Sequence, residues 1–95
     1  MDHYRLILYV AGQSARSRSA IRNLNRICET ALQNRCEVQI VDVLEQPQIA
    51  ESDRILATPT LVKEQPAPIR RIIGDLSDTQ RLLDGLDIQV DGRTE

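Results

Sequence analysis

Apolar runs alternate along the chain with a stretch of helical repeat, a pattern typical of a mixed α/β domain. Residues 4–10 (YRLILYV) are almost continuously apolar and precede Ala11-Gly12, which predicts a strand buried on both faces. Serines within 14–19 are candidate N-caps of a helix, and the run 38–43 (VQIVDV) predicts the next strand. Strand, helix and strand in this order favour a right-handed parallel crossover. The helical stripe consists of Ala20, Ile21, Leu24, Ile27, Cys28, Ala31 and Leu32.

Prolines mark the elements of the second half of the chain. Pro47 suits the first turn of a short helix that carries Ile49 and Ala50 inward. The segment 58–62 (TPTLV) predicts a third strand, and the segment 66–68 (PAP) predicts a turn. The second half therefore continues as a short helix and then a hairpin.

Two segments near the carboxyl end fit both a helix and a strand. The apolar positions of segment 69–76 match a fourth strand, but their spacing also matches a helix. Ser77 and Gln80 form a capping box for a last helix, which Gly85 weakens. Apolar residues then alternate through 86–90, so the end of this helix also has the pattern of a strand. The last helix would bury Leu82, Leu83 and Leu86.

The predicted order βαβαββα is that of a thioredoxin-like fold of the α/β class. Thr58-Pro59 stands at the entry to the third strand, where thioredoxin-like folds hold a cis-proline, so we expect a cis bond at Pro59. We expect one domain over residues 1–90 and a flexible polar tail over residues 91–95.

Charge and composition exclude several classes of protein. The 95 residues carry a formal net charge of −2, which argues against general binding to nucleic acid, because such binding needs a basic surface. With no Phe or Trp and only two Tyr, the core must be aliphatic. The longest apolar stretch near the start, residues 6–11, is far shorter than a membrane span, so we expect a cytoplasmic protein without membrane contact.

The expected start of the first helix lacks the residue that thioredoxin-type redox chemistry requires. Such enzymes keep a nucleophilic cysteine there, whereas segment 12–17 reads GQSARS. Ser14 or Ser17 could stabilise a thiolate in a glutathione-dependent enzyme, with Lys63-Glu64 as the only further polar support, but helix capping is the better interpretation. Asp42 has no second acid nearby and is interpreted as a strand-end residue.

The two cysteines do not form a known motif. Cys28 lies on the apolar face of the predicted helix and Cys36 just before a strand, a spacing that matches neither a redox C-x-x-C pair nor a zinc site. His3 alone cannot complete a metal site with them. We therefore interpret both thiols as incidental and expect no catalytic residue, metal or cofactor.

Two groups of basic residues leave two interpretations open. One group lines a face of the first predicted helix, and the other lies on the expected hairpin. Such stripes usually form a solvated face, but arginine is also enriched where proteins dock, so each group could contact an acidic partner. The first group is Arg18, Arg22 and Arg26, and the second is Lys63, Arg70 and Arg71.

Several long sequence blocks, in order, resemble the KaiB family of circadian clock proteins over residues 4–90. A more distant resemblance is to the amino-terminal domain of SasA, a clock-linked sensor kinase. The blocks are Tyr9-Val10-Ala11-Gly12, Val41-Asp42-Val43-Leu44, Pro47-Gln48-Ile49-Ala50-Glu51, Ile55-Leu56-Ala57-Thr58-Pro59-Thr60-Leu61 and Arg70-Arg71-Ile72-Ile73-Gly74-Asp75-Leu76-Ser77.

The resemblance implies a non-enzymatic adaptor. Proteins of this family bind the amino-terminal ATPase ring of KaiC, a hexameric ATPase and autokinase, sequester KaiA and displace SasA. Their binding-competent monomer is thioredoxin-like, whereas the ground state, a homodimer or homotetramer, has the order βαββααβ in a rearranged carboxyl-terminal half. Related chains also act in stress adaptation. The alternatives are a glutathione- or thiol-dependent enzyme and a sensory input module of a histidine kinase.

The resemblance also assigns roles to individual residues. Basic positions used in partner docking correspond to Arg54, Lys63 and Arg71, next to Arg70. Isomerisation of X-Pro bonds takes tens of seconds or longer and would slow an exchange of folds. The positions expected to influence that exchange are Tyr4, Pro59, Pro66, Pro68, Gly85 and Asp87.

Overall fold

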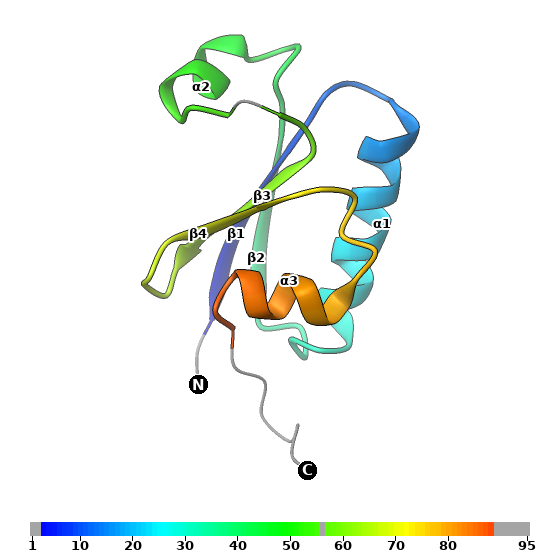
Figure 1. The fold of residues 1–95 in the computed structure, drawn as a ribbon, viewed down its shortest axis with the longest axis vertical. Coiled ribbons are helices and arrows are strands. Elements are labelled where there is room, and N and C mark those ends of the chain that lie inside the picture. The colour runs from blue at the N-terminus through cyan, green and yellow to red at the C-terminus, as the bar shows by residue number, and fades with distance from the viewer. Residues whose placement is uncertain (1–2, 56, 89–95) are drawn as a thin grey trace.

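The computed structural model describes residues 3–55 and 57–88, which form four strands and three helices in the predicted order βαβαββα (Figure 1). The elements are β1 (Tyr4–Val10), α1 (Ala15–Glu29), β2 (Cys36–Asp42), α2 (Pro47–Ser52), β3 (Thr60–Gln65), β4 (Arg70–Ile73) and α3 (Thr79–Gly85).

The strands form one mixed sheet in the order β2-β1-β3-β4. β1 lies in the interior and pairs in parallel with β2, from Tyr4 opposite Cys36 to Val10 opposite Asp42. On its other side β1 pairs antiparallel with β3, which in turn pairs antiparallel with β4. The parallel β1–α1–β2 crossover and the β3–β4 hairpin confirm the predicted topology.

The larger hydrophobic core lies between one face of the sheet and the helices α1 and α3. Figure 1 shows these two helices on the same side of the sheet, with α2 at the end far from α3. Side chains alternate along β1, so Leu6 and Leu8 point to this core, and both are fully buried. Burying each leucine contributes about 1.5–3 kcal/mol. The core is aliphatic as predicted, apart from Tyr4, and α1 and α3 supply Ala20, Leu24, Ile27, Cys28, Leu82 and Leu83.

The opposite face of the sheet has a thinner cover. Ile7 and Tyr9 of β1 form a small second core there with Val41 and Val62. Only half-buried side chains from α2 and its flanking segments pack against it, and no residue of the six-residue α2 is buried. Ile49 therefore points inward as predicted but stays partly exposed, and much of this face remains open to solvent.

Local hydrogen bonds move some predicted boundaries. β2 begins at Cys36, two residues before the predicted strand, because parallel pairing with β1 extends to Tyr4. The predicted capping box at Ser77 is wrong. The Ser77 amide donates to the Asp75 carboxylate, and Asp78 caps α3 instead by accepting a hydrogen bond from the Arg81 amide. A carboxylate one residue later competes successfully for the first amides of the helix.

The two ambiguous segments take different conformations in this fold. Residues 70–73 form the edge strand β4, whose pairing with β3 overrides their helical spacing. Leu86 is the C-cap residue of α3, and the amide of Ile88 bonds to the Leu83 carbonyl, so the chain turns rather than starting a strand. Val90 and the expected tail 91–95 lie outside the described residues.

The X-Pro bonds at the hairpin are all cis. Thr58-Pro59 has the cis bond that the thioredoxin-like pattern predicts, at the entry to β3. Gln65-Pro66 and Ala67-Pro68 are cis as well, in the connection between β3 and β4. The predicted turn at residues 66–68 is therefore confirmed.

Candidate protein-docking surface

The start of α1 uses its serine hydroxyls for capping. Ser14 accepts a hydrogen bond from the Ser17 amide, and its own hydroxyl donates to the Ser17 oxygen over 2.9 Å. Ser17 is buried and also accepts from the Ala11 amide at 3.1 Å. Both hydroxyls are thus engaged within the fold, which supports the capping interpretation over a thiolate-stabilising role.

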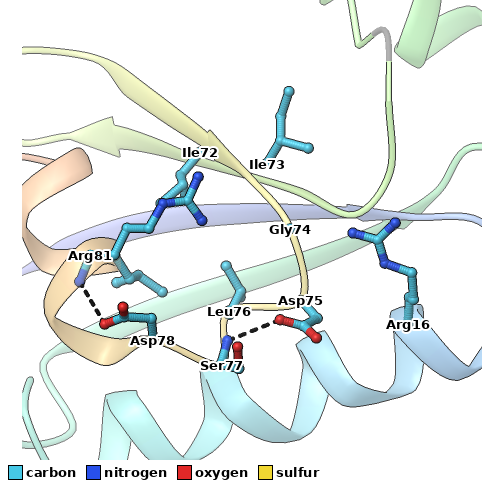
Figure 2. A pocket seen from close by; sticks show the side chains of 10 residues that line it. Arg16, Ile72, Ile73, Gly74, Asp75, Leu76, Ser77, Asp78 and Arg81 are labelled. Atoms are coloured by element: carbon cyan, nitrogen blue, oxygen red, sulfur yellow. Dashed lines mark hydrogen bonds between the residues drawn. The ribbon is translucent and has the colours of Figure 1, made fainter.

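A hollow of about 250 Å³ lies beside this helix start and the cis-proline loop (Figure 2). The guanidinium groups of Arg16 and Arg81 lie on opposite sides of Gly74, whose amide bonds to the Pro59 carbonyl. The carboxylates in the lining are already used: Asp75 accepts from an amide at 3.2 Å and Asp78 from another at 3.0 Å. The described lining residues include neither a cysteine nor a histidine. The hollow therefore offers no thiol chemistry.

On the open face of the sheet, a hydrogen-bond network ties β4 to the segment after α2. The Arg71 guanidinium donates to the carbonyl oxygens of Arg54 at 3.1 Å and Asp53 at 3.2 Å. From β1, the Tyr9 hydroxyl donates to the Asp53 carboxylate. Burial and the bond to Asp53 raise the pKa of Tyr9, so its hydroxyl remains a donor at neutral pH. The network holds Arg54 and Arg71 side by side.

Apolar side chains flank this network. Ile69 and Ile73 lie on the same side of β4 as Arg71, because side chains alternate along a strand. They are 64% and 50% exposed. Together with Arg54, they define what we call the β4 face: Arg54, Ile69, Arg71 and Ile73. Next to it is a shallow hollow of about 160 Å³, lined by Tyr9, Asp53, Val62, Glu64, Ile69 and Arg71.

The structure separates the other predicted basic residues from this face. Arg70 is exposed on the opposite side of β4, where it pairs in register with Lys63. Lys63 is only 1% exposed and lies beneath the carboxyl end of α3, so its side chain is not accessible to a partner in this fold, and its docking role stays a prediction. Its position on the strand face that carries the core side chain Leu61 explains the burial, because residues two apart share a face.

Lys63 is an unusual core residue. Its ammonium donates one hydrogen bond, 3.4 Å long, to the carbonyl oxygen of Asp87. Burial lowers the pKa of Lys63, and the nearby Asp87 carboxylate opposes that shift. Asp87 itself adopts a left-handed backbone conformation (φ 56°) just after α3. The segment after α3 therefore packs over the Lys63 ammonium, which is buried among apolar side chains.

The other residues expected to influence a change of fold lie at different depths. Tyr4 is buried in the main core. Gly85 is the last residue of α3, and a Cβ there would lie 3.2 Å from Cδ1 of Ile72 on β4. Pro59 is fully buried, whereas Pro66 and Pro68 are half-buried in the hairpin connection. Gly85 thus faces β4, whereas Asp87 contacts Lys63 of β3.

Sequence patterns alone did not identify the apolar half of the β4 face. Ile69 and Ile73 fit either periodicity and were assigned no surface role, and Tyr9 and Asp53 are 44 positions apart. The one signal in the sequence that could have indicated this surface was that Ile69 and Ile73 lie two positions on either side of Arg71 in the predicted fourth strand. Asp42 was assigned correctly: it accepts bonds from the amides of Gly12 and Leu44 at the end of β2.

The fold defines the class: a thioredoxin-like α/β protein whose first helix begins without a cysteine. The KaiB domain family matches residues 7–88, and the chain belongs to the KaiB family. It is 51% identical over 94 residues to the circadian clock protein KaiB3 of a Synechocystis species, covering 97% of this chain and 92% of that protein. It is 55% identical over 85 residues to the circadian clock oscillator protein KaiB of Acaryochloris marina, covering 90% and 82%.

Solved structures agree with the thioredoxin-like architecture. The amino-terminal domain of Synechococcus elongatus SasA superposes with a TM-score of 0.73 at 26% identity, covering 99% of this chain and 91% of that domain. Yeast mitochondrial thioredoxin 3 gives a TM-score of 0.70 at 20% identity, covering 92% and 79%, and shows the shared fold alone. In the described part of the chain, no helix is long and apolar enough to span a bilayer, and no three metal-binding side chains cluster.

Proposed function

We propose that this chain is a non-enzymatic adaptor that binds a KaiC-like hexameric ATPase and thereby changes its phosphorylation state and its access to KaiA- or SasA-like partners. Membership of the KaiB family of clock proteins is the observation that carries the proposal. The similarity to the SasA domain supports it further, because two proteins of one fold can compete for one docking site.

The β4 face has the chemistry of a docking surface. It combines the Arg71 guanidinium and the exposed residue Arg54 with two exposed isoleucines, and arginine and apolar side chains are typical of interface centres. Arg71 is already held by two hydrogen bonds, so little side-chain entropy is lost when a partner binds. The partner surface that fits is acidic with an apolar centre.

The carboxyl-terminal part of the fold contains features that would favour exchange with a second arrangement. Leu76 is buried with a left-handed backbone (φ 66°), which costs about 1–2 kcal/mol for a side chain of this kind. Asp87 has a similar conformation, and Lys63 is buried with a lowered pKa. We propose that the thioredoxin-like form is the binding-competent one and exchanges with the βαββααβ ground state. Its fractional population would then scale the apparent affinity.

A binding titration with a KaiC hexamer tests the partner and the surface together. Wild-type chain should form a complex after prolonged incubation, and Arg71→Glu should weaken it by about tenfold or more, since it places a carboxylate against an acidic surface. Arg22→Glu, an exposed arginine on α1, is the matched control and should bind within about twofold of wild type.

Two results would contradict the proposal in different ways. If the wild type forms no complex even with Gly85→Ala introduced, a KaiC-like ATPase is not the partner. If Arg71→Glu binds as the wild type does, the partner contacts another surface. Capture of a SasA-like kinase instead of KaiC would favour the second candidate, a sensory input module, which the SasA similarity supports.

Gly85→Ala should stabilise the thioredoxin-like form. Gly85 ends α3 without a positive φ, so alanine fits the backbone and gains up to about 1 kcal/mol of helix propensity. Its Cβ meets only the flexible end of Ile72, which can move by a few tenths of an ångström. Chemical denaturation measures the stability, and the apparent KaiC affinity should rise in parallel. A lower denaturation midpoint than that of the wild type would mean that the Ile72 side chain cannot move away from the new Cβ.

A further inference from the structure

The two cysteines, 8 positions apart in sequence, meet in the structure. Cys28 lies in the last turns of α1, and Cys36 is the first residue of β2. A tight reversal between them uses left-handed backbone at Gln33 and Asn34. The Asn34 amide bonds to the Cys28 carbonyl at 2.7 Å, which fixes the return of the chain beside the helix.

The side chains of both cysteines pack into the same apolar cluster. Cys28 is 8% exposed within that core, and Cys36 packs against it while remaining partly open to solvent. Each thiol also shifts the pKa of the other, as neighbouring side chains do, and both cysteines are free. Such proximity is one requirement of a disulfide, which also needs Cβ vectors that do not diverge.

The two thiols are not equivalent. The hydrogen bond to Cys36 and burial both raise the pKa of Cys28, which keeps its proton. Accepting that bond, with help from the neighbouring Arg35 guanidinium, lowers the pKa of Cys36. Cys36 is also the more exposed of the pair. It therefore has the properties of an attacking sulfur, and Cys28 those of a resolving thiol.

We propose that Cys28 and Cys36 form a redox site that closes to an intramolecular disulfide on reaction with a hydroperoxide. The Cys36 thiolate attacks the terminal peroxide oxygen, the O–O bond breaks, and Cys36 becomes a sulfenic acid while the leaving alkoxide or hydroxide takes up a proton. The Cys28 sulfur then attacks the Cys36 sulfur, and water leaves as the S–S bond forms. In sum, two thiols are oxidised by two electrons, and one hydroperoxide is reduced to water and an alcohol, or to two waters.

The site is independent of the proposed adaptor function and of the β4 face. In a reducing compartment the resting state is the dithiol, so a disulfide here would be a transient response to oxidant. No third metal-binding side chain joins the pair among the described residues. The bridge would close a short loop linking α1 to β2.

Oxidation of the full-length reduced protein with hydrogen peroxide tests the proposal without any substitution. Intact-mass analysis under alkylating conditions should show a monomer that has lost two hydrogens and both alkylation sites, and dithiothreitol should restore them. The oxidised protein should melt about 10 °C higher, because the bridge restricts the unfolded chain. Persistence of two alkylatable thiols, or a disulfide between two chains, would overturn it.

Single variants assign the order of attack. Cys28→Ser should still react but stop at a sulfenic acid on Cys36, which dimedone captures. Cys36→Ser should consume peroxide at least about tenfold more slowly, because the remaining thiol is buried with a raised pKa. If the two variants exchanged these behaviours, Cys28 would be the attacking sulfur and the assignment made here would be wrong.

Discussion

Leu86→Ala is expected to lower the free energy of unfolding of the thioredoxin-like form by about 2–5 kcal/mol, the usual cost of truncating a buried leucine. Leu86 is fully buried at the end of α3, a helix of 7 residues. So short a helix is not stable alone and depends on the leucines it packs against the sheet. Since domains of this size have about 5–15 kcal/mol of stability, a loss of this size removes a large part of the total.

Urea denaturation measures this effect directly, and Leu44→Ala serves as its control. Leu44 is 70% exposed, so its truncation should change stability by no more than about 0.5 kcal/mol. Hydrogen exchange should show loss of protection confined first to α3 and the segment after it. A cost below about 1 kcal/mol for Leu86→Ala would show that α3 contributes little to the fold.

Lys63→Met is expected to raise the free energy of unfolding by about 1–3 kcal/mol, because it removes a buried charge that has only one long hydrogen bond. Methionine fills a similar volume and packs against the same apolar neighbours. The stabilised state is the thioredoxin-like one. If the proposed exchange of folds operates, the apparent affinity for KaiC should increase by the same factor as the population of that state.

The pH dependence gives Lys63→Met a second readout. Burial lowers the folded-state pKa of Lys63 below its ordinary value of 10.5, so between the two values the unfolded chain binds more protons. As the pH rises toward 10.5, the free energy of unfolding of the wild type should therefore increase relative to that of the variant. Taking the difference between the two proteins removes the contribution of Tyr9 and the other titrating groups.

Arg70→Met is the matched control for this experiment. Arg70 pairs in register with Lys63 but is exposed, so its replacement should leave the stability nearly unchanged. Its charge also helps to lower the pKa of Lys63, so the pH dependence should shrink somewhat but persist. If Lys63→Met destabilised the protein instead, the ammonium group would be making a favourable interaction with the Asp87 segment that outweighs the cost of its burial.

Both predictions concern the same region, the contact of α3 and the Asp87 segment with the hairpin. The sheet strands β1 and β3 and helix α1 have long buried stripes, whereas α3 depends on a few leucines above a buried lysine. A balance between folds can be shifted most easily where stability is low. The proposed exchange is therefore placed in the half of the chain where the sequence fits two periodicities.

Local patterns were sufficient to predict most of the fold. β1 matches residues 4–10, α1 begins after the predicted cap Ser14, and the bond before Pro59 is cis as expected. These features depend on neighbouring residues, on side-chain alternation and on turn chemistry. The N-cap of α3 was missed because Ser77 and Asp78 compete for the same role, and only the bond of the Ser77 amide to Asp75 decides between them.

The candidate site could be predicted only in part. Arg54 and Arg71 were identified from the family resemblance, but their contact through backbone carbonyls appears only when α2 and β4 meet. Lys63 was grouped with them by the same resemblance, and with Arg70 and Arg71 by its charge on the expected hairpin. Strand alternation places it on the opposite side of the sheet, where it is buried.

By itself, then, the sequence determined that the first helix begins without a redox cysteine, that the chain has the thioredoxin-like order, and that its carboxyl-terminal half fits two periodicities. The tertiary structure decided which periodicity prevails in this fold, which basic residues share a surface, and that Cys28 and Cys36 are neighbours. The physical reason is the sequence distance over which each interaction acts. Periodicity and capping act over a few residues, whereas sheet pairing, burial and contact between distant side chains depend on how the whole chain packs.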